Sequence, residues 1–435
     1  MIARLLLVFL LSVPCARGAT EIQFWHAMSG ALGEQTEALV QRFNASQDEV
    51  RVVTSFKGGY DETLQSALAA QLAGKGPHVV QVYDGGTANM VEAKHTARPL
   101  WQVMAEAGQH FDARAYMPAV ASYFSDDKGR LLALPFNTST PVLYYNKDAF
   151  RRAKLDPEKP PKTWYEIIAM LGELSDSGRR CAYVTAYPSW VLLENMSAWH
   201  NQEFATKENG LGGTAARLNF NSRLMVRWIS MLSTWVKAGY FTPTGRTNEA
   251  ERKFVSGECS VLTTTSAAYA QLRRDAKFDF GVAQLPYYDD FPEAPQNTLI
   301  GGAGLWAMEG KKPAEYRAVA RFFAFLSQPE VQAEWHERTG YVPITRAAYE
   351  RARDEGFYAR NPGYEVAIRQ LLLRNPTRDS KGIRLGFMPQ IRNIIEEELE
   401  AVWAQRKTPK DALDAAVARG NDLLQRFELA HRHGR

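Results

Sequence analysis

Three hydroxyl-rich segments of the chain could hold a polar ligand, and each one follows or interrupts an apolar run. They span residues 134–150 (LPFNTSTPVLYYNKDAF), 254–266 (FVSGECSVLTTTS) and 296–306 (QNTLIGGAGLW). In the first segment, Pro135 and Pro141 each fix φ and lack an N–H group, which disfavours one continuous central strand. We interpret this segment as a crossover between two lobes, where ligand pockets preferentially form. The other two are candidate further crossovers, and the glycines of the third could present N–H groups to an anion.

The residues that would indicate catalysis are not arranged in a familiar motif. The sequence contains no G-x-S-x-G elbow, no H-E-x-x-H and no G-x-x-x-x-G-K-[ST] loop. Its eight histidines show no paired metal-ligand spacing except His431 and His433 in the basic tail, so we expect no metal and no cofactor. Carboxylates are plentiful, and a glycosidase pair stays open. Hydroxyls at crossovers nevertheless favour a binding protein over an enzyme.

The N-terminal residues resemble a signal peptide. Arg4 is followed by an apolar stretch, residues 5–13, that is too short to span a bilayer. Small residues then predict cleavage near Gly18 or Ala19. Cys15 lacks the small-residue box that lipidation needs, so residues 1–18 are expected to be removed. No later run reaches roughly 18 apolar residues, and we therefore expect an exported protein without membrane insertion.

Composition narrows the function classes further. The chain has 435 residues, is 45% hydrophobic and 23% charged, and has a net charge of +4, values typical of a globular protein large enough for two lobes. Basic residues alternate with acidic ones, so no nucleic-acid partner is expected. Beyond the signal peptide only Cys181 and Cys259 remain. They could form a disulfide in an oxidising compartment or be two buried thiols.

Strands and helices alternate in the N-terminal part. The residue pattern predicts strands over 21–25, 50–56 and 78–83 and helices over 32–43 and 62–73, which indicates a parallel sheet of α/β type. In such sheets ligands bind beyond the carboxyl ends of the strands. His26, Tyr60 and Asp84 follow those ends and are candidate contacts. Tyr187 and Trp190 lie in an aromatic loop that could stack on a polyol or be core.

Several short motifs together resemble the bacterial extracellular solute-binding proteins of ABC importers, the family that contains the maltose-binding protein. They are Phe24-Trp25-His26, Lys57-Gly58-x-Tyr60, residues 81–84 (QVYD), 145–150 (YNKDAF), 160–164 (PPKTW), 300–303 (IGGA), 334–336 (EWH), 339–341 (TGY) and 384–392 (RLGFMPQIR). The last run is specific to the glycerol-3-phosphate-binding group of that family. The resemblance covers essentially the whole mature chain.

The resemblance implies a ligand site made of seven positions, namely Tyr60, Asp84, Ser139, Thr265, Gly302, Tyr341 and Arg392. Tyr187, Trp190, Trp25 and His26 are secondary candidates. The guanidinium of Arg392 can form a two-pronged hydrogen bond that suits a phosphate monoester. Asp84 is expected to accept hydrogen bonds from the glycerol hydroxyls, at some distance from that phosphate. The sequence departs from the pattern of the family at three positions. Asp84 stands where relatives have the longer Glu, Thr265 where they have Ser, and Tyr187 where they have Trp. The last change could widen the pocket toward a glycerophosphodiester such as glycerophosphocholine.

The implied protein is a monomeric periplasmic receptor with a two-lobed α/β fold, a hinge of about three crossovers and an interlobe cleft. We expect residues 19–139 and 261–306 in the first lobe, and 140–260 and 307–435 in the second. Its partners would be glycerol-3-phosphate or a glycerophosphodiester, and the permease subunits of an ABC importer. Alternatives are an oligosaccharide receptor of the same fold, or a secreted phosphodiesterase or glycosidase.

Overall fold

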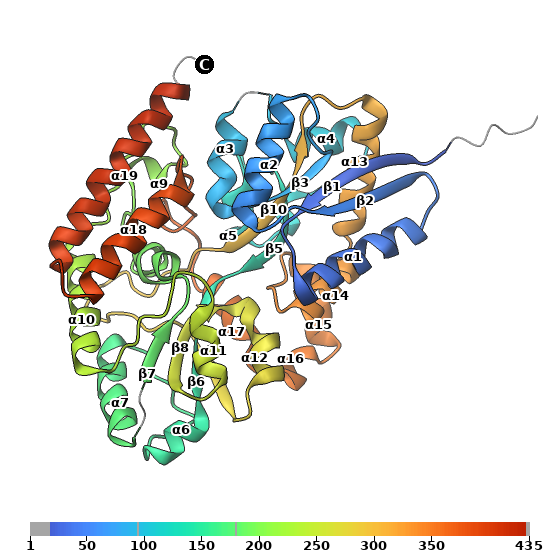
Figure 1. Cartoon of the computed structure of the whole chain (residues 1–435). Helices are drawn as coiled ribbons and strands as arrows, with labels where there is room; N and C mark the ends of the chain where they lie inside the picture. The colour runs from blue at the N-terminus through green and yellow to red at the C-terminus, as the bar shows by residue number, and fades with distance from the viewer. Residues whose placement is uncertain (1–17, 94, 179–180, 432–435) are drawn as a thin grey trace, which may run out of the picture.

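The computed structural model describes residues 18–93, 95–178 and 181–431, and its strands form two separate sheets. The expected signal peptide therefore lies almost entirely outside the described residues. Each sheet is the centre of one lobe (Figure 1). Within the described part of the chain, no helix has the length and apolarity to cross a bilayer, and no cluster of His, Cys, Asp and Glu is suited to a metal ion.

The first lobe contains a sheet of order β2-β1-β3-β10-β4, with β5 paired to β10. Its strands are β1 Thr20–His26, β2 Val50–Phe56, β3 Val79–Tyr83, β4 Ala97–Arg98, β5 Leu134–Ser139 and β10 Gly301–Met308. Its helices are α1 Gly30–Ala45, α2 Tyr60–Leu72, η1 Asp84–Gly86, α3 Thr87–Glu92, α4 Leu100–Glu106, η2 Ala113–Ala115, α5 Pro118–Phe124, α13 Pro313–Leu326 and α14 Pro329–Thr339. The predicted N-terminal strands and helices are confirmed. The sheet is mixed, because β10 runs antiparallel to β3.

The second lobe contains a sheet of order β7-β8-β6-β9. Its strands are β6 Pro141–Asn146, β7 Cys181–Thr185, β8 Cys259–Thr265 and β9 Phe280–Ala283. The surrounding helices are α6 Lys147–Arg152, α7 Trp164–Asp176, the π-helix η3 Ser189–Glu194, α8 Asn195–Trp199, α9 Thr206–Asn209, α10 Arg223–Ala238, α11 Glu249–Val255, η4 Ser266–Ala268, α12 Tyr269–Asp275 and α17 Tyr364–Leu371. Cys181 and Cys259 lie opposite each other on β7 and β8 and form a disulfide.

Local sequence signals explain where the helices begin and end. Thr163 and Glu166 form a reciprocal capping box at α7, with distances of 3.1 and 3.2 Å. In α10, Ser222 accepts a hydrogen bond from the Met225 N–H, and Gly239 ends the helix at φ +76°. Apolar side chains at helical spacing, including Trp228, turn one side of α10 into the core.

Two C-terminal helices, α18 Met388–Trp403 and α19 Pro409–His431, pack against each other and against α10 (Figure 1). Thr408 caps α19 through the Asp411 N–H, with Pro409 at the first helical position as predicted. The first turns of α18 reach both η1 of the first lobe and η3 of the second. This helix therefore carries its side chains to the boundary between the lobes.

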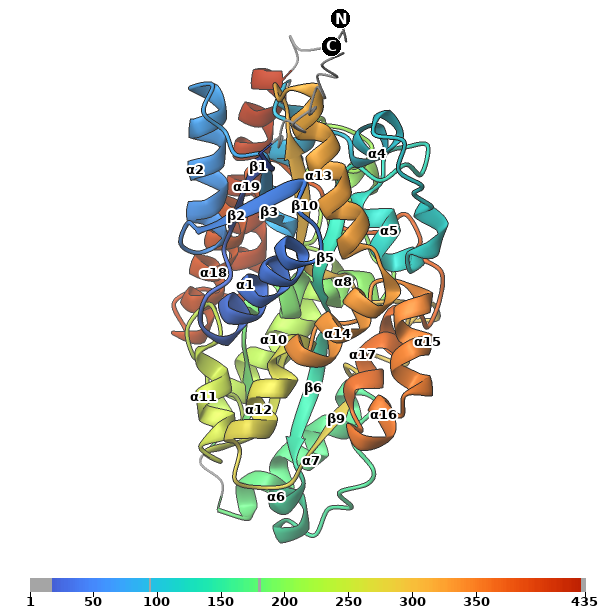
Figure 2. The ribbon, with the colours of Figure 1, turned by 90° about the vertical axis from the view of Figure 1, so that its right-hand side faces the viewer.

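The chain passes between the lobes at the first and third predicted crossovers. β5 belongs to the first sheet and β6 to the second, with Thr140 between them, and Figure 2 shows the two strands following one another from one lobe into the other. The segment between β9 and β10 returns to the first sheet. A further passage separates α14, which packs on α1, from α17, which packs on β6 and β9. The short α15 Arg346–Asp354 and α16 Phe357–Arg360 lie along that passage.

Two details of the expected organisation are wrong. The segment 263–266 does not leave its sheet, because β8 and the following β9 both pair with β6. Residues 261–283 therefore belong with the second lobe, not the first. Conversely, α13 packs on β1 and α4, which places the beginning of the 307–435 segment in the first lobe. Strand pairing and helix packing decide both assignments.

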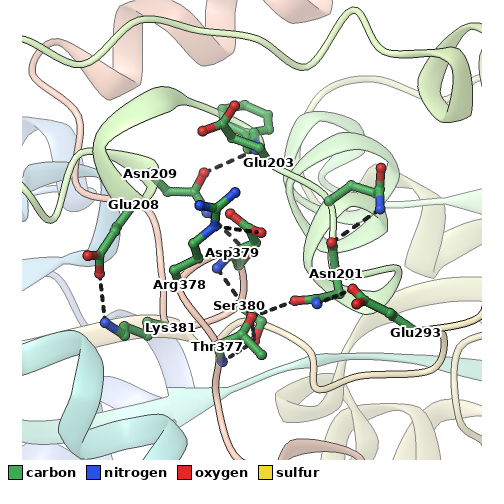
Figure 3. Close-up of polar contacts among 12 residues, drawn as sticks. Asn201, Glu203, Glu208, Asn209, Glu293, Thr377, Arg378, Asp379, Ser380 and Lys381 are labelled. Atoms are coloured by element: carbon green, nitrogen blue, oxygen red, sulfur yellow. Dashed lines mark hydrogen bonds and ion pairs between the residues drawn. The ribbon is translucent and has the colours of Figure 1, made fainter.

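A polar network holds the loop that leads into α18 (Figure 3). Asn209 Nδ2 donates to the Asp379 carbonyl (3.1 Å). The Ser380 hydroxyl donates to Asn297 Oδ1 (2.7 Å). Lys381 pairs with Glu208 at 2.7 Å. These contacts attach the loop to the segment after α8 and to the third crossover. The position of α18 at the lobe boundary is fixed from its N-terminal side as a result.

Candidate ligand site at the lobe boundary

Arg392 on α18 joins the two lobes through carboxylates. Its Nη2 donates to Asp84 Oδ2 of η1, in the first lobe, at 2.5 Å. Its Nε and Nη2 donate to the two oxygens of Glu194, at the end of η3 in the second lobe, at 2.8 and 2.7 Å. Glu194 is only 2% exposed. The guanidinium therefore lies between one carboxylate of each lobe.

The electrostatics of this cluster follow from burial and pairing. Burial alone would lower the pKa of the Arg392 guanidinium, but the Asp84 and Glu194 carboxylates outweigh it and raise that pKa well above its ordinary value. Arg392 is therefore charged at neutral pH. One cation faces two anions, so the cluster has a formal charge of −1 before any ligand binds.

Asp84 is held through both its backbone and its side chain. Its backbone is held by Tyr123, whose hydroxyl donates to the Asp84 carbonyl at 2.6 Å. Its carboxylate contacts Arg392 directly. An anion bound to the Nη2 side of Arg392 must therefore displace Asp84 or share the guanidinium with it, and the distance between Asp84 and a bound phosphate stays a prediction.

A group of aromatic and amide side chains continues the site into the first lobe. Tyr60 begins α2 and stacks on Tyr83, with ring centroids 5.1 Å apart and an interplanar angle of 16°. Its hydroxyl accepts a hydrogen bond from Asn137 Nδ2 at 2.8 Å. Tyr341 is buried beside them, and burial raises its pKa to about 12, although Asn137 and Tyr60 lower it. These phenols stay protonated and can donate hydrogen bonds at neutral pH.

The first and third crossovers meet where β5 pairs with β10. Ser139 lies opposite Gly301, and Gly302 opposite Thr138. Gly302 has φ +103°, and a Cβ there would lie 1.8 Å from the Asn137 carbonyl oxygen, so only glycine fits. Within the described residues, the Ser139 hydroxyl has no protein hydrogen-bond partner.

The second lobe contributes Thr265 and the aromatic loop. Thr265 ends β8 opposite Pro141, next to the first crossover, and its hydroxyl accepts from the Ala267 N–H at 3.2 Å. Trp190 packs against Gly301, where an added Cβ would lie 2.6 Å from its ring. Tyr187 meets Trp190 edge to face at 6.4 Å. Both aromatic side chains therefore lie at the lobe boundary and do not belong only to the core.

Two secondary candidates lie elsewhere. His26 is buried, its Nδ1 accepts from the Met28 N–H, and its Nε2 lies 3.4 Å from Glu37 of α1. Burial lowers the pKa of His26 despite the Glu37 carboxylate, so the ring is protonated less readily than an ordinary imidazole. Trp25 stacks under the Lys57 ammonium at 4.0 Å. Within the described part of the chain, no hydrogen bond or ring contact connects either residue with Arg392 or Asp84.

Sequence reasoning missed Glu194 and Asn137. Glu194 follows the apolar run 190–193, and a carboxylate after such a run is a candidate buried ion. Its partner is 198 positions away in the chain, so sequence could not identify it. Asn137 lies in the first hydroxyl-rich segment, where its Oδ1 accepts from Gln81 Nε2 at 2.7 Å and its Nδ2 donates to Tyr60.

Comparison with known proteins identifies the family. A model of the bacterial extracellular solute-binding proteins matches residues 38–366. The chain belongs to this family. It is 49% identical to the sn-glycerol-3-phosphate-binding periplasmic proteins of Yersinia pestis, over 96% of this chain and 95% of the relative, and of Escherichia coli K12, over 95% and 94%.

Solved structures show the same fold at lower sequence identity. UgpB from Mycobacterium tuberculosis, in complex with glycerophosphocholine, has a TM-score of 0.78 at 24% identity, covering 94% of this chain and 99% of that one. The cyclic alpha-maltosyl-1,6-maltose binding protein from Arthrobacter globiformis has a TM-score of 0.77 at 22% identity, covering 94% and 100%. The expected two-lobed α/β solute-binding fold is confirmed.

Proposed function

We propose that this chain is the periplasmic substrate-binding component of an ABC importer and that it captures sn-glycerol-3-phosphate or a glycerophosphodiester such as glycerophosphocholine. The observation that carries the proposal is the Arg392 guanidinium at the lobe boundary, which is partly buried and paired with Asp84, so that a phosphate can exchange with that carboxylate. The names of the 49% identical relatives support the same ligand class. Closure of the lobes around the ligand would form the state that the membrane permease selects.

The proposed contacts divide by chemistry. Arg392 binds the phosphate as a charge-assisted fork. Neutral hydrogen-bond donors bind the remaining phosphate oxygens. The candidate donors are the hydroxyls of Ser139, Thr265 and Tyr341 and the Gly302 N–H. Asp84, once released from Arg392, accepts hydrogen bonds from the glycerol hydroxyls. The rings of Tyr60, Tyr187 and Trp190 enclose the carbon skeleton. Trp25 and His26 are left out because their contacts lie elsewhere.

A neutral oligosaccharide is the second ligand class that this fold could serve, because the family also includes maltose binders. Arg392 argues against it. Burying a guanidinium between Asp84 and Glu194 is costly, and a sugar without charge offers it no counterion when Asp84 moves away. A phosphate group replaces the lost carboxylate with another anion. The site therefore favours a phosphorylated glycerol compound.

A phosphorus NMR titration separates binding from catalysis. The protein is incubated with glycerophosphocholine and, separately, with glycerol-3-phosphate, and the resonances are followed for hours. We expect a shifted or broadened ligand signal with no new phosphorus species. Appearance of a phosphomonoester in the glycerophosphocholine sample would contradict the binding-protein proposal and favour a phosphodiesterase. Release of inorganic phosphate in the glycerol-3-phosphate sample would contradict it as well and would indicate a phosphomonoesterase. Unchanged signals at high protein concentration would reject the ligand class.

A further inference from the structure

Glu194 and Arg392 form a pair that belongs to one lobe. The end of η3 carries Glu194, α18 carries Arg392, and the two helices pack together. The Ser189 hydroxyl supports Glu194 Oε1 at 3.2 Å, and the Ser189 N–H donates to Glu396 Oε1 on α18 at 2.7 Å. Opening the lobes separates Arg392 from Asp84, which lies in the first lobe, but leaves the Glu194 pair intact.

The guanidinium has two edges that can form a fork, and Glu194 takes only one of them. Its carboxylate accepts from Nε and Nη2, the side edge. Nη1 has no hydrogen-bond partner among the described residues, and the second N–H of Nη2 points to Asp84. The end edge, made of Nη1 and Nη2, is therefore the one that a ligand can reach once Asp84 moves.

We infer that Glu194 is a positioning residue that turns the end edge of Arg392 toward the ligand and weakens the preference that Arg392 alone would give to doubly charged phosphomonoesters over singly charged phosphodiesters. This inference rests on the proposed function. Glu194 holds the guanidinium before the ligand arrives, which reduces the cost of ordering it. Its negative charge stays in the site after Asp84 is displaced, and it repels each additional charge on the phosphate.

A charge-matched pair of ligands tests this role. Glycerol-3-phosphate carries nearly two negative charges at pH 7, and its methyl phosphodiester carries one. Calorimetric titration gives the ratio of their affinities for the unaltered chain and for Glu194→Gln. We expect the variant to shift this ratio about tenfold or more toward the monoester, as one buried charge several ångströms from the phosphate implies. Loss of positioning weakens the binding of both ligands.

Two further variants distinguish positioning from a general structural role. Glu194→Asp keeps the charge but shortens the reach, so both affinities fall while their ratio stays unchanged. Glu396→Gln is the matched control. Glu396 is a buried carboxyl on α18, the helix of Arg392, and it contacts Ser189 but not Arg392. Burial raises the pKa of this carboxyl to about 8. It is largely uncharged at pH 7, so its replacement leaves the ratio unchanged.

The outcomes are separable. A folded Glu194→Gln variant with the unaltered ratio overturns the inference, whereas an unaltered chain that binds neither ligand rejects the proposed function and the inference with it. A crystal structure of the unaltered chain with the phosphodiester provides a test without substitution. It should show the phosphate on Nη1 and Nη2 with Glu194 still on Nε. A phosphate on the Nε edge would contradict the proposal even if no variant folds.

Discussion

Replacing Glu396 with Gln should change how the stability of the protein depends on pH. Glu396 is 7% exposed, and its Oε1 accepts from the Ser189 N–H at 2.7 Å. Burial raises the pKa of this carboxyl to about 8, although the Ser189 N–H and Arg246 oppose the shift. The folded protein therefore keeps Glu396 protonated up to about pH 8, whereas the unfolded chain releases that proton near 4.5.

The sign of the effect follows from proton linkage. Between pH 4.5 and 8 the unfolded state binds fewer protons at this residue, so Glu396 lowers the free energy of unfolding as pH rises. Each pH unit across this window is worth about 1.4 kcal/mol, which sets an upper bound of several kcal/mol at pH 8. Gln keeps an acceptor for the Ser189 N–H and cannot ionise. Glu396→Gln should therefore stabilise the protein at pH 8 and have little effect near pH 4.5.

Urea unfolding at pH 5, 6, 7 and 8 measures this difference, because other titrating groups cancel between variant and parent. Glu400→Gln is the pH-independent control. Hydrogen bonds from Arg246 lower the pKa of the Glu400 carboxyl below its ordinary 4.5, so its small stabilising effect is fully present from pH 5 to 8 and is lost only at lower pH. Glu400→Gln should therefore cause a small destabilisation that does not change across this range. A Glu396→Gln advantage that is constant over this pH range would refute the assignment of a buried protonated carboxyl.

Three other changes test the fold and the cleft. Removing the disulfide with Cys181→Ala and Cys259→Ala should cost about 4 kcal/mol of unfolding free energy in urea, because the bridge closes a loop with a sequence separation of 78. Gly302→Ala should destabilise the protein far more than Gly310→Ala in thermal unfolding. Both glycines have positive φ, but only the first places a Cβ against backbone, so equal losses would contradict the packing. Asp84→Asn weakens the ion pair between Asp84 and Arg392 across the cleft. X-ray scattering of this variant without ligand should therefore show a larger radius of gyration than that of the unaltered chain. An unchanged radius would mean that this pair does not hold the lobes together.

Local signals in the sequence predicted the elements that depend on local forces. The residue pattern predicted β1, β2 and β3 with the helices between them, and Thr163 and Thr408 marked the starts of α7 and α19. Pro135 and Pro141 marked the first crossover, because proline restricts the backbone wherever it lies. These features need no knowledge of distant contacts.

Strand pairing could not be predicted in the same way. Residues 254–266 show an apolar run followed by hydroxyls, as the first crossover does, yet β8 ends inside its own sheet. The pattern is the same because any buried strand that ends at the lobe boundary exchanges apolar for polar side chains. Only the pairing of β8 and β9 with β6 distinguishes a strand end from a crossover.

Most positions of the candidate ligand site came from the motifs of the family, although the predicted strand ends had already indicated Tyr60 and Asp84. The resemblance supplied Arg392, and the structure brings it to the lobe boundary with Asp84, although the two are separated by 308 positions. Glu194 had no such motif, and its role depends on a contact that only folding creates. Trp25 and His26 matched a family motif, but Trp25 contacts Lys57 and His26 lies beside Glu37 of α1.

Calorimetric titration with glycerol-3-phosphate, glycerophosphocholine and maltose, for the unaltered chain and for Arg392→Ala, tests the central claim most directly. We expect binding of at least one glycerophosphoryl compound, no binding of maltose, and a loss in the variant of about 2–5 kcal/mol or more of binding free energy, with thermal unfolding confirming that it folds. Tight maltose binding, or unchanged affinity for the glycerophosphoryl ligand without Arg392, would contradict the account.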